Sequence, residues 1–170
     1  MTVDPLTLAY CAGLFDGEGS FSFQMVIRPT GKRRCFTIAP RLSMSLKYGG
    51  YVLDDLVACF GGHCVEYESM RYWTLTRRVL VEEATHLLLP YLRLKRGIAL
   101  RFLEALELMP RQRAVHLRGE RTWTVEAAVR VATIALTLNP TRRSPKDNDY
   151  IAQVREVFAS TDTRKAVGVG

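Results

Sequence analysis

The sequence predicts an α+β fold in which helices cover one face of a four-stranded antiparallel sheet and leave the other face open. Two observations lead to this prediction. Apolar and polar residues alternate in two pairs of segments before residue 77, the pattern of half-buried strands joined as hairpins. Apolar residues recur at helical spacing before each pair of strands and again after the second pair. The predicted order is therefore helix, hairpin, helix, hairpin and then helices.

The first helix and the first hairpin occupy the segment up to residue 44. Asp4-Pro5 is a helix start, because an N-cap acid is followed by proline at the first helical position. We expect this helix to continue to Phe15 and to stop in 16–19, where two glycines allow a tight turn. The period then changes to two, which predicts strands at 20–28 and 36–44.

The second half begins with a helix at 52–60, which Gly61-Gly62 ends. A shorter hairpin follows, with strands at 64–68 and 72–76 and a turn at 69–71. Apolar residues at helical spacing then predict helices at 79–89, 94–109, 125–138 and 150–158.

The composition is that of a folded protein, with 48% hydrophobic and 24% charged residues in a chain of 170. We expect a single domain over 1–160 and a C-terminal tail at 161–170. No apolar run is long enough to span a membrane, no secretory signal is evident, and the four cysteines form no C-x-x-C pair. These features predict that the protein works in a reducing compartment, either the cytoplasm or the interior of an organelle.

Basic residues outnumber acidic ones, 24 to 17, giving a net charge of +7. Such a surplus favours a polyanionic partner through counterion release. A solvated basic face on a protein with another role is the alternative, and charge alone leaves both open.

The end of the first helix combines small residues with acids. Ala9, Ala12 and Gly13 lie on consecutive turns and let another helix approach closely. Asp16 and Glu18 follow, where the helix dipole disfavours negative charge. A hard divalent cation held by carboxylate and carbonyl oxygens is one explanation, and a capped, solvated turn is the other.

The segment Cys11–Gly19, CAGLFDGEG, resembles the LAGLIDADG motif of homing endonucleases, in the class with one motif per chain. The segments Leu89–Lys95 and Asn139–Arg143 and the element order resemble that class as well, so the resemblance covers nearly the whole chain. It implies a LAGLIDADG-type αββαββα fold with a saddle-shaped sheet, and a homodimer on a long pseudo-palindromic site in double-stranded DNA. It also implies an intron-encoded, site-specific endonuclease that makes a staggered double-strand break with 3′ overhangs.

The resemblance also implies roles for individual residues. The small residues of the first helix would pack against their copies in a second subunit. Glu18, the last acid of the motif, would bind Mg²⁺ together with the backbone carbonyl of Gly17. Lys95 matches the basic residue beside the cleaved phosphate, and Lys47 is a further catalytic candidate. Mn²⁺ should replace Mg²⁺, Ca²⁺ should bind without supporting cleavage, and no small-molecule cofactor is expected.

The open face of the sheet is where the resemblance implies contacts with DNA. Glutamine can pair with adenine and arginine with guanine in the major groove, and basic loops can anchor phosphates. Glu66 and Glu68 either accept hydrogen bonds from cytosine amines or form salt bridges with Arg71 and Arg41. The full set of candidates is Ser22, Gln24, Arg28, Lys32, Arg33, Arg34, Thr37, Arg41, Ser43, Glu66, Glu68, Arg71, Arg142, Arg143 and Lys146.

The chain departs from the family pattern at three places. The motif ends in Glu18 where the family usually has Asp, and a glutamate can still bind metal. The polar residue expected after the second strand falls on Ser45, Leu46 or Lys47, and Gly49-Gly50 stands where the family has a basic residue.

Two alternative functions remain open. One is a relative that binds without cleaving, as an RNA maturase or a DNA-binding protein. The other is a monomeric, basic, RNA-binding structural protein.

Overall fold

The computed structural model describes residues 3–30, 33–110, 124–138 and 149–157, with the side chains of 28–36 left out of the description. The chain divides into two compact units, Met1–Gln24 with Ala39–Leu103 and Met25–Ile38 with Glu104–Gly170. Two strands and one helix have residues in both units, and the single domain over 1–160 stays a prediction. The 161–170 tail lies outside the described residues.

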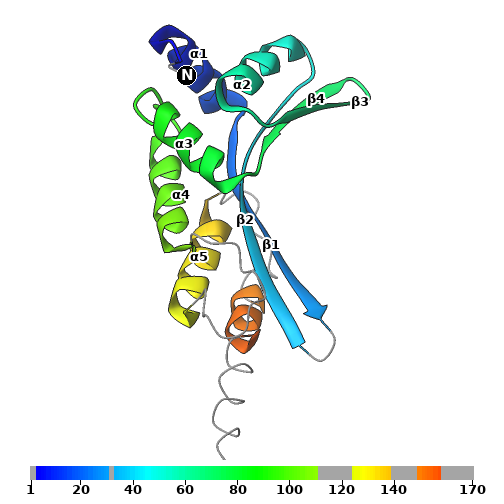
Figure 1. Cartoon of the computed structure of the whole chain (residues 1–170), viewed down its shortest axis with the longest axis vertical. Helices are drawn as coiled ribbons and strands as arrows, with labels where there is room; N and C mark the ends of the chain where they lie inside the picture. Colours follow the sequence, from blue (N-terminus) through cyan, green and yellow to red (C-terminus); the bar gives the residue numbers. More distant parts are fainter. Residues whose placement is uncertain (1–2, 31–32, 111–123, 139–148, 158–170) are drawn as a thin grey trace, which may run out of the picture. The chain divides into compact units, whose positions relative to one another are not determined.

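The sheet has four antiparallel strands in the order β1 (Ser20–Thr30), β2 (Arg33–Leu46), β4 (Met70–Leu75) and β3 (His63–Tyr67) (Figure 1). This arrangement confirms the predicted fold class. The register is set by pairs that put apolar residues on one face, such as Leu42 opposite Leu75 and Met44 opposite Trp73.

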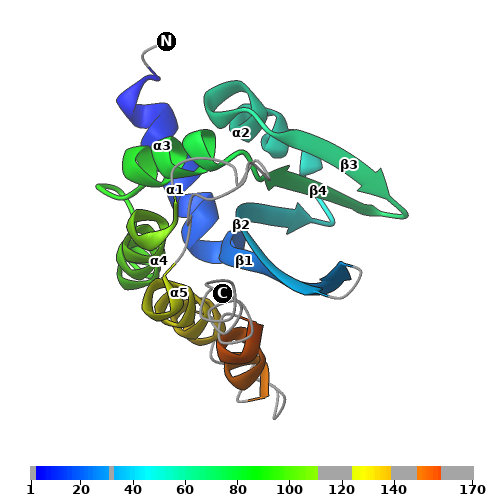
Figure 2. The same ribbon diagram turned by 60° about the horizontal axis from the view of Figure 1, so that its bottom comes forward.

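The helices of the first unit are α1 (Pro5–Glu18), the short 3₁₀ helix η1 (Gly50–Val52), α2 (Leu53–Phe60), α3 (Arg78–Leu88) and the beginning of α4 (Arg96–Leu108) (Figure 2). The Asp4 carboxylate caps α1 by accepting from the Thr7 N–H at 3.0 Å, as the sequence predicts. Gly61, with φ of 76°, ends α2. Helix α1 contacts α3, and α2 packs on the β3–β4 hairpin.

Four aromatic residues form the centre of this unit's core. Phe15 of α1 has its ring centroid 4.9 Å from that of Phe21 and 6.4 Å from that of Trp73, both edge-on. Phe21 in turn lies 5.4 Å from Phe102 of α4, and all four side chains are fully buried. The indole N–H of Trp73 donates to the Gly61 carbonyl at 2.9 Å. The core therefore lies on the face of the sheet that carries Phe21 and Trp73.

The described part of the second unit includes α5 (Val125–Thr137) and a helix at 149–157. The Thr124 hydroxyl caps α5 by accepting from the Ala127 N–H at 3.1 Å. An ion pair of 2.6 Å joins Arg130 of α5 to Glu104 of α4. Among the residues described, no helix is long and apolar enough to cross a membrane.

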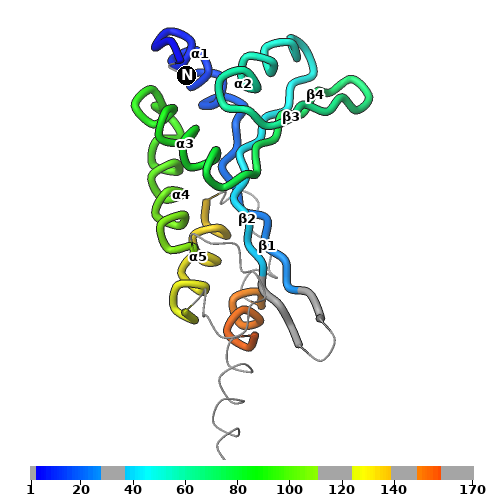
Figure 3. Tube along the Cα trace, viewed as in Figure 1, coloured from blue at the N-terminus to red at the C-terminus, as the bar shows by residue number. Residues whose placement is uncertain are grey.

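Several boundaries differ from the sequence prediction by one to three residues, and two of these differences bear on the site. Helix α1 does not stop at Phe15 but continues through Asp16 and Gly17 to Glu18, and Gly19 caps it in an extended conformation with φ of −72°. Tyr67 pairs with Met70, so the turn of the second hairpin falls on Glu68 and Ser69. Figure 3 shows this β3–β4 hairpin at the upper right. The expected turn at 69–71 was therefore placed too late in the chain.

A substitution at Gly19 tests how closely the backbone packs against Phe15 where α1 meets β1. A Cβ at Gly19 would overlap the ring of the buried Phe15, so Gly19→Ala should destabilise the protein by about 1–3 kcal/mol through overpacking. Gly97→Ala is the matched control, because a Cβ there meets nothing within 4 Å on α4. It should be neutral or stabilising by up to about 1 kcal/mol. Urea unfolding of both variants measures the difference, and equal midpoints would contradict the packing argument.

Candidate active site and nucleic-acid interface

The carboxylate of Asp16 anchors the turn that precedes α4 to the end of α1. It accepts from the backbone N–H groups of Arg93 at 2.6 Å, Leu94 at 3.2 Å and Lys95 at 2.9 Å. Burial favours the neutral acid, but the three N–H donors and the Lys95 charge outweigh it, so the pKa of Asp16 lies below its usual value. Asp16 therefore acts as an anion that holds the turn in position.

The side chain of Lys95 in turn caps the C-terminus of α1. Its Nζ donates to the carbonyls of Phe15 at 2.9 Å, Asp16 at 2.6 Å and Gly17 at 3.1 Å. A cation is favourable there because the last carbonyls of a helix carry partial negative charge. Burial lowers the pKa of Lys95, and the nearby carboxylates of Asp16 and Glu18 counteract part of that effect.

Glu18 is exposed at the last position of α1. Its carboxylate and the Gly17 carbonyl are hard oxygen ligands of the kind that Mg²⁺ prefers. A carbonyl oxygen has two lone pairs, so the Lys95 contact leaves one on Gly17 for a metal. Among the described residues, no group of three or more His, Cys, Asp or Glu could hold a metal within one chain. The residues therefore fit a divalent ion in part, and its other ligands would have to come from outside this set.

The register of β2 separates the three candidates for the second polar position. Leu46 lies opposite Arg71 and shares a face with the buried Met44, whereas Ser45 lies opposite Tyr72 on the open face. Lys47 follows the strand and is exposed, with its Nζ 5.5 Å from the ring centroid of Tyr48. Ser45 is thus the polar side chain that β2 presents on the open face near its end.

The open face of the first unit carries several of the predicted DNA contacts. Ser22 and Gln24 of β1 and Arg41 and Ser43 of β2 occupy the positions between the core-facing residues. The Ser22 hydroxyl donates to the Arg41 carbonyl at 3.4 Å. The Arg41 guanidinium donates to the Thr74 hydroxyl at 3.5 Å. Thr37, in the second unit, is exposed on β2.

The β3–β4 hairpin corrects part of the prediction. Glu66 and Arg71 lie opposite each other on the face of Trp73, not on the open face. The Arg71 guanidinium donates to both carboxylate oxygens of Asp54, at 2.8 and 3.2 Å, and to the Gly50 carbonyl at 2.8 Å. These hydrogen bonds lower the pKa of Asp54. The salt bridge of Arg71 is therefore with Asp54 in place of a hairpin glutamate, and Glu68 lies exposed in the turn with φ of 55°.

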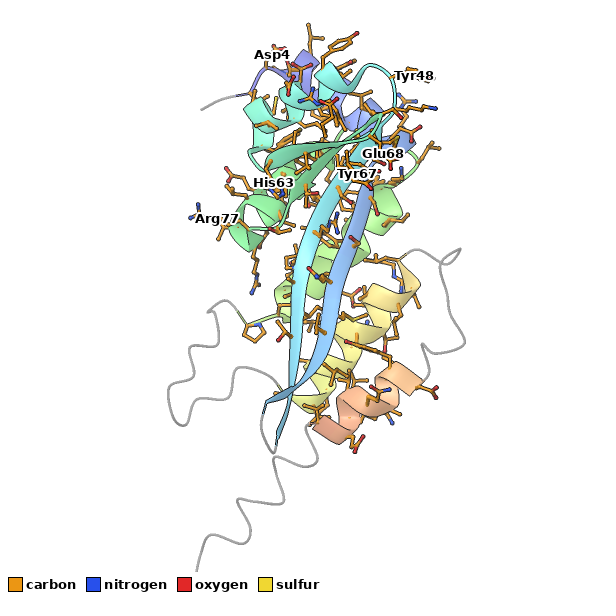
Figure 4. All side chains as sticks on the ribbon, turned by 90° about the vertical axis from the view of Figure 1, so that its right-hand side faces the viewer. Asp4, Tyr48, His63, Tyr67, Glu68 and Arg77 are labelled. Atoms are coloured by element: carbon orange, nitrogen blue, oxygen red, sulfur yellow. The ribbon has the colours of Figure 1, made fainter. Side chains whose placement is uncertain are left out.

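The residues that the hairpin does present on the open face were missed by sequence reasoning. Figure 4 looks onto this face and labels His63 and Tyr67 of β3. Val65 lies between them, and Tyr72 lies opposite Val65 on β4. Alternation from the apolar Trp73 is a signal that could have found Tyr72, because it assigns Arg71 to the core side and Tyr72 to the other side. The β3 residues could be assigned only once the register of the hairpin was known.

Other predicted residues lie outside the description. The side chains of Arg28, Lys32, Arg33 and Arg34 are not described, nor are the residues of the loop that contains Arg142, Arg143 and Lys146.

Helix α1 has an exposed stripe of apolar and small residues. Ala12 is fully buried within its own chain, so its side chain has no surface left for a second subunit. Ala9 and Gly13 are exposed together with Leu6 and Tyr10, and these four lie on one side of the helix because Ala9 and Tyr10 are each three or four residues from both Leu6 and Gly13. The expected interface residues thus divide into one core residue and two surface residues.

The Asp16 anchor gives a pH-dependent prediction. Replacing Asp16 with Asn keeps the shape but removes the charge that accepts three N–H groups, and should cost about 1–3 kcal/mol at neutral pH. Because the folded-state pKa is lowered, this stabilisation is present above the ordinary aspartate pKa and is lost as the pH falls through the folded value. Urea unfolding from pH 7 to pH 2 should show wild type and Asp16→Asn converging in acid. Glu83→Gln on the exposed side of α3 is the control and should match wild type throughout.

No protein-family model and no curated protein matches the sequence. The structure, by contrast, is similar to solved homing endonucleases. One is I-CvuI in complex with its target in the presence of calcium, with a TM-score of 0.71 and 20% identity over 91% of this chain and 94% of that one. Another is the archaeal intron-encoded I-Vdi141I complexed with DNA, with a TM-score of 0.67 and 18% identity over 93% and 98% of the two chains. A third is I-TnaI, with a TM-score of 0.62 and 17% identity over 92% and 98%. The chain therefore has the fold of the single-motif LAGLIDADG homing endonucleases, as the segment at the end of α1 implied.

Proposed function

We propose that two copies of this chain form a site-specific DNA endonuclease of the homing type, which makes a metal-dependent, staggered break in a long pseudo-palindromic duplex. The observation that carries the proposal is the end of α1. There the exposed carboxylate of Glu18 follows the Gly17 carbonyl and interacts electrostatically with the Lys95 ammonium. Oxygen ligands for a hard cation and a fixed positive charge are what phosphodiester hydrolysis requires.

The proposed roles follow from this geometry. Glu18 and the Gly17 carbonyl would hold Mg²⁺ or Mn²⁺, which supplies an activated water and neutralises charge on the phosphate. Lys95, fixed on three carbonyls, adds a positive charge that does not have to be ordered during the reaction. The Ser45 hydroxyl on the open face can orient a water, and Lys47 can reach a phosphate.

Dimerisation is supported by the exposed stripe on α1 and by the number of ligands. Small residues at Ala9 and Gly13 let a second copy of α1 approach closely, with Leu6 and Tyr10 adding apolar area at 80% and 49% exposure. A two-fold axis beside this stripe would double Glu18 and give one centre for each DNA strand. The homodimer thus completes a site that one chain only half provides.

The open face of the sheet suits a duplex. Within the described strand segments of the first unit, the only acidic residue is Glu66, and it lies on the opposite face. Ser22, Gln24, Arg41 and Ser43 offer donors and acceptors for base edges. The surplus of positive charge, +7 for the whole chain, supports binding to the phosphates.

A second candidate is sequence-specific binding without cleavage, as in a maturase or a DNA-binding protein. Two observations favour it: Gly49-Gly50 provides no basic side chain after β2, and the Lys95 ammonium is already engaged by three carbonyls. Both candidates share the fold and the open face, and cleavage distinguishes them.

The cleavage test uses plasmids carrying a duplex selected from a randomised library. With Mg²⁺ the wild type should cut both strands, and Glu18→Gln should reduce the rate by roughly 10²–10³-fold or more because the metal loses its charged ligand. Glu83→Gln, an exposed acid on α3, is the matched control and should cut as wild type does. Specific binding with no cutting in Mg²⁺ or Mn²⁺ would establish the second candidate instead.

The dimer test places a charge on the α1 stripe. Ala9→Glu should convert a dimer to a monomer in sedimentation equilibrium, because two like charges would meet at the two-fold axis. Ala58→Glu makes the same change on the exposed side of α2 and should leave the dimer intact. A wild type that sediments as a monomer, alone and with DNA, would remove the two-copy proposal.

A further inference from the structure

The open face of β2, β4 and β3 is arranged in rows that change from polar to apolar toward the hairpin turn. One row is Ser43, Thr74 and His63, which lie opposite one another across the three strands. The next row is Ser45, Tyr72 and Val65, and the last pair before the turn is Met70 and Tyr67. The pairing therefore collects Val65, Tyr67 and Tyr72 at one end of the open face; we refer to these three residues as the hairpin face.

The hairpin face exposes apolar side-chain surface to solvent. Val65 is 52% exposed, Tyr67 65% and Tyr72 38%. Glu66 and Arg71 do not cover it, because they lie on the opposite face, whereas Glu68 lies beside Tyr67 in the turn (Figure 4). Val65 has no hydrogen-bonding group in its side chain, so it can gain free energy from a partner only by apolar contact.

The surroundings of the hairpin face indicate which partner it meets. It is continuous with the row that contains Thr74, which accepts from the Arg41 guanidinium, and Glu66 on the other face is the only acid in the described strands of this unit. A polyanion with an ordered set of polar edges fits that surface, and the proposed duplex is such a partner. In the major groove, the one apolar group that distinguishes a natural base is the 5-methyl of thymine.

We infer that the hairpin face reads thymine methyl groups in the major groove of the target. Val65 contributes methyl-to-methyl contact, and the rings of Tyr67 and Tyr72 supply apolar edges on either side of it. The inference rests on the proposed binding of a specific duplex and adds which base one segment of each half-site must contain. It also makes Val65 a specificity-determining residue, although it carries no group that can hydrogen-bond to a base.

The test removes the methyl group alone. A duplex selected by the wild type from a randomised library is resynthesised with deoxyuridine in place of thymidine, one position at a time, which keeps every hydrogen-bonding edge. Binding is measured by titration in a chelating buffer, so that no cleavage occurs. At the thymine beneath Val65 the affinity should fall by about three- to five-fold, the effect of one buried methyl group.

Matched variants identify the contact. Val65→Ser should bind the thymine and uracil duplexes equally, because the apolar partner of the methyl group is gone. Val79→Ser makes the same change at an exposed valine of α3, 66% exposed, and should keep the full preference for thymine. Tyr67→Ser should reduce the preference at a neighbouring position.

Several outcomes would overturn the inference while leaving the endonuclease in place. These are a selected site without thymine in that segment, uracil tolerated at every position, or a preference for thymine unchanged in Val65→Ser. A change of oligomeric state in Val65→Ser would assign the hairpin face to a protein contact instead. If the library yields no enriched duplex, the proposed function itself fails and the inference fails with it.

Discussion

The reciprocal contact between Asp16 and Lys95 is the interaction on which the candidate site depends. Asp16 accepts hydrogen bonds from the backbone N–H groups of 93–95, and the Lys95 ammonium donates to the carbonyls of 15–17. Each segment therefore supplies hydrogen-bond partners for backbone groups of the other. A helix that ends in two acids is electrostatically unfavourable by itself, and the Lys95 ammonium offsets that cost. The contact therefore lets α1 end in an exposed glutamate at a fixed position, which neither segment could achieve alone.

The last turn of α1 also determines which face of the sheet is open. Phe15 lies one residue before Asp16, and its ring contacts both Phe21 and Trp73 in the core. Those contacts assign one face of β1 and of β4 to the interior, and alternation then assigns Ser22, Gln24 and Tyr72 to the other. Gly19 belongs to the same arrangement, because a side chain there would occupy the volume of the Phe15 ring. The acid and the open face are thus positioned by one turn of helix.

Periodicity predicted the order of the elements, because the core of each helix and strand is set by spacing within a short segment. Periodicity failed where contacts between residues far apart in the sequence determine an element boundary or a side-chain partner. Two glycines around Glu18 favoured a turn, but the Lys95 cap, nearly 80 residues away, lets α1 continue to Glu18. The hairpin turn falls on Glu68, a residue type that rarely adopts positive φ, so no local signal marked it. Arg71 was likewise unpredictable as the partner of Asp54, because the pair joins α2 to β4.

The misplaced turn shows why a boundary error matters for function more than for fold. The strand order is the same whether the turn lies at 68–69 or at 69–71, yet the observed register places Glu66 on the face of Trp73 and brings Arg71 from the expected turn onto that face as well. A face expected to carry charges carries Val65, Tyr67 and Tyr72 instead. Charged side chains there would give affinity that falls with salt, whereas apolar contacts with base edges are little affected by it. The register of one hairpin therefore determines whether this surface contributes mainly to affinity or to the choice of sequence.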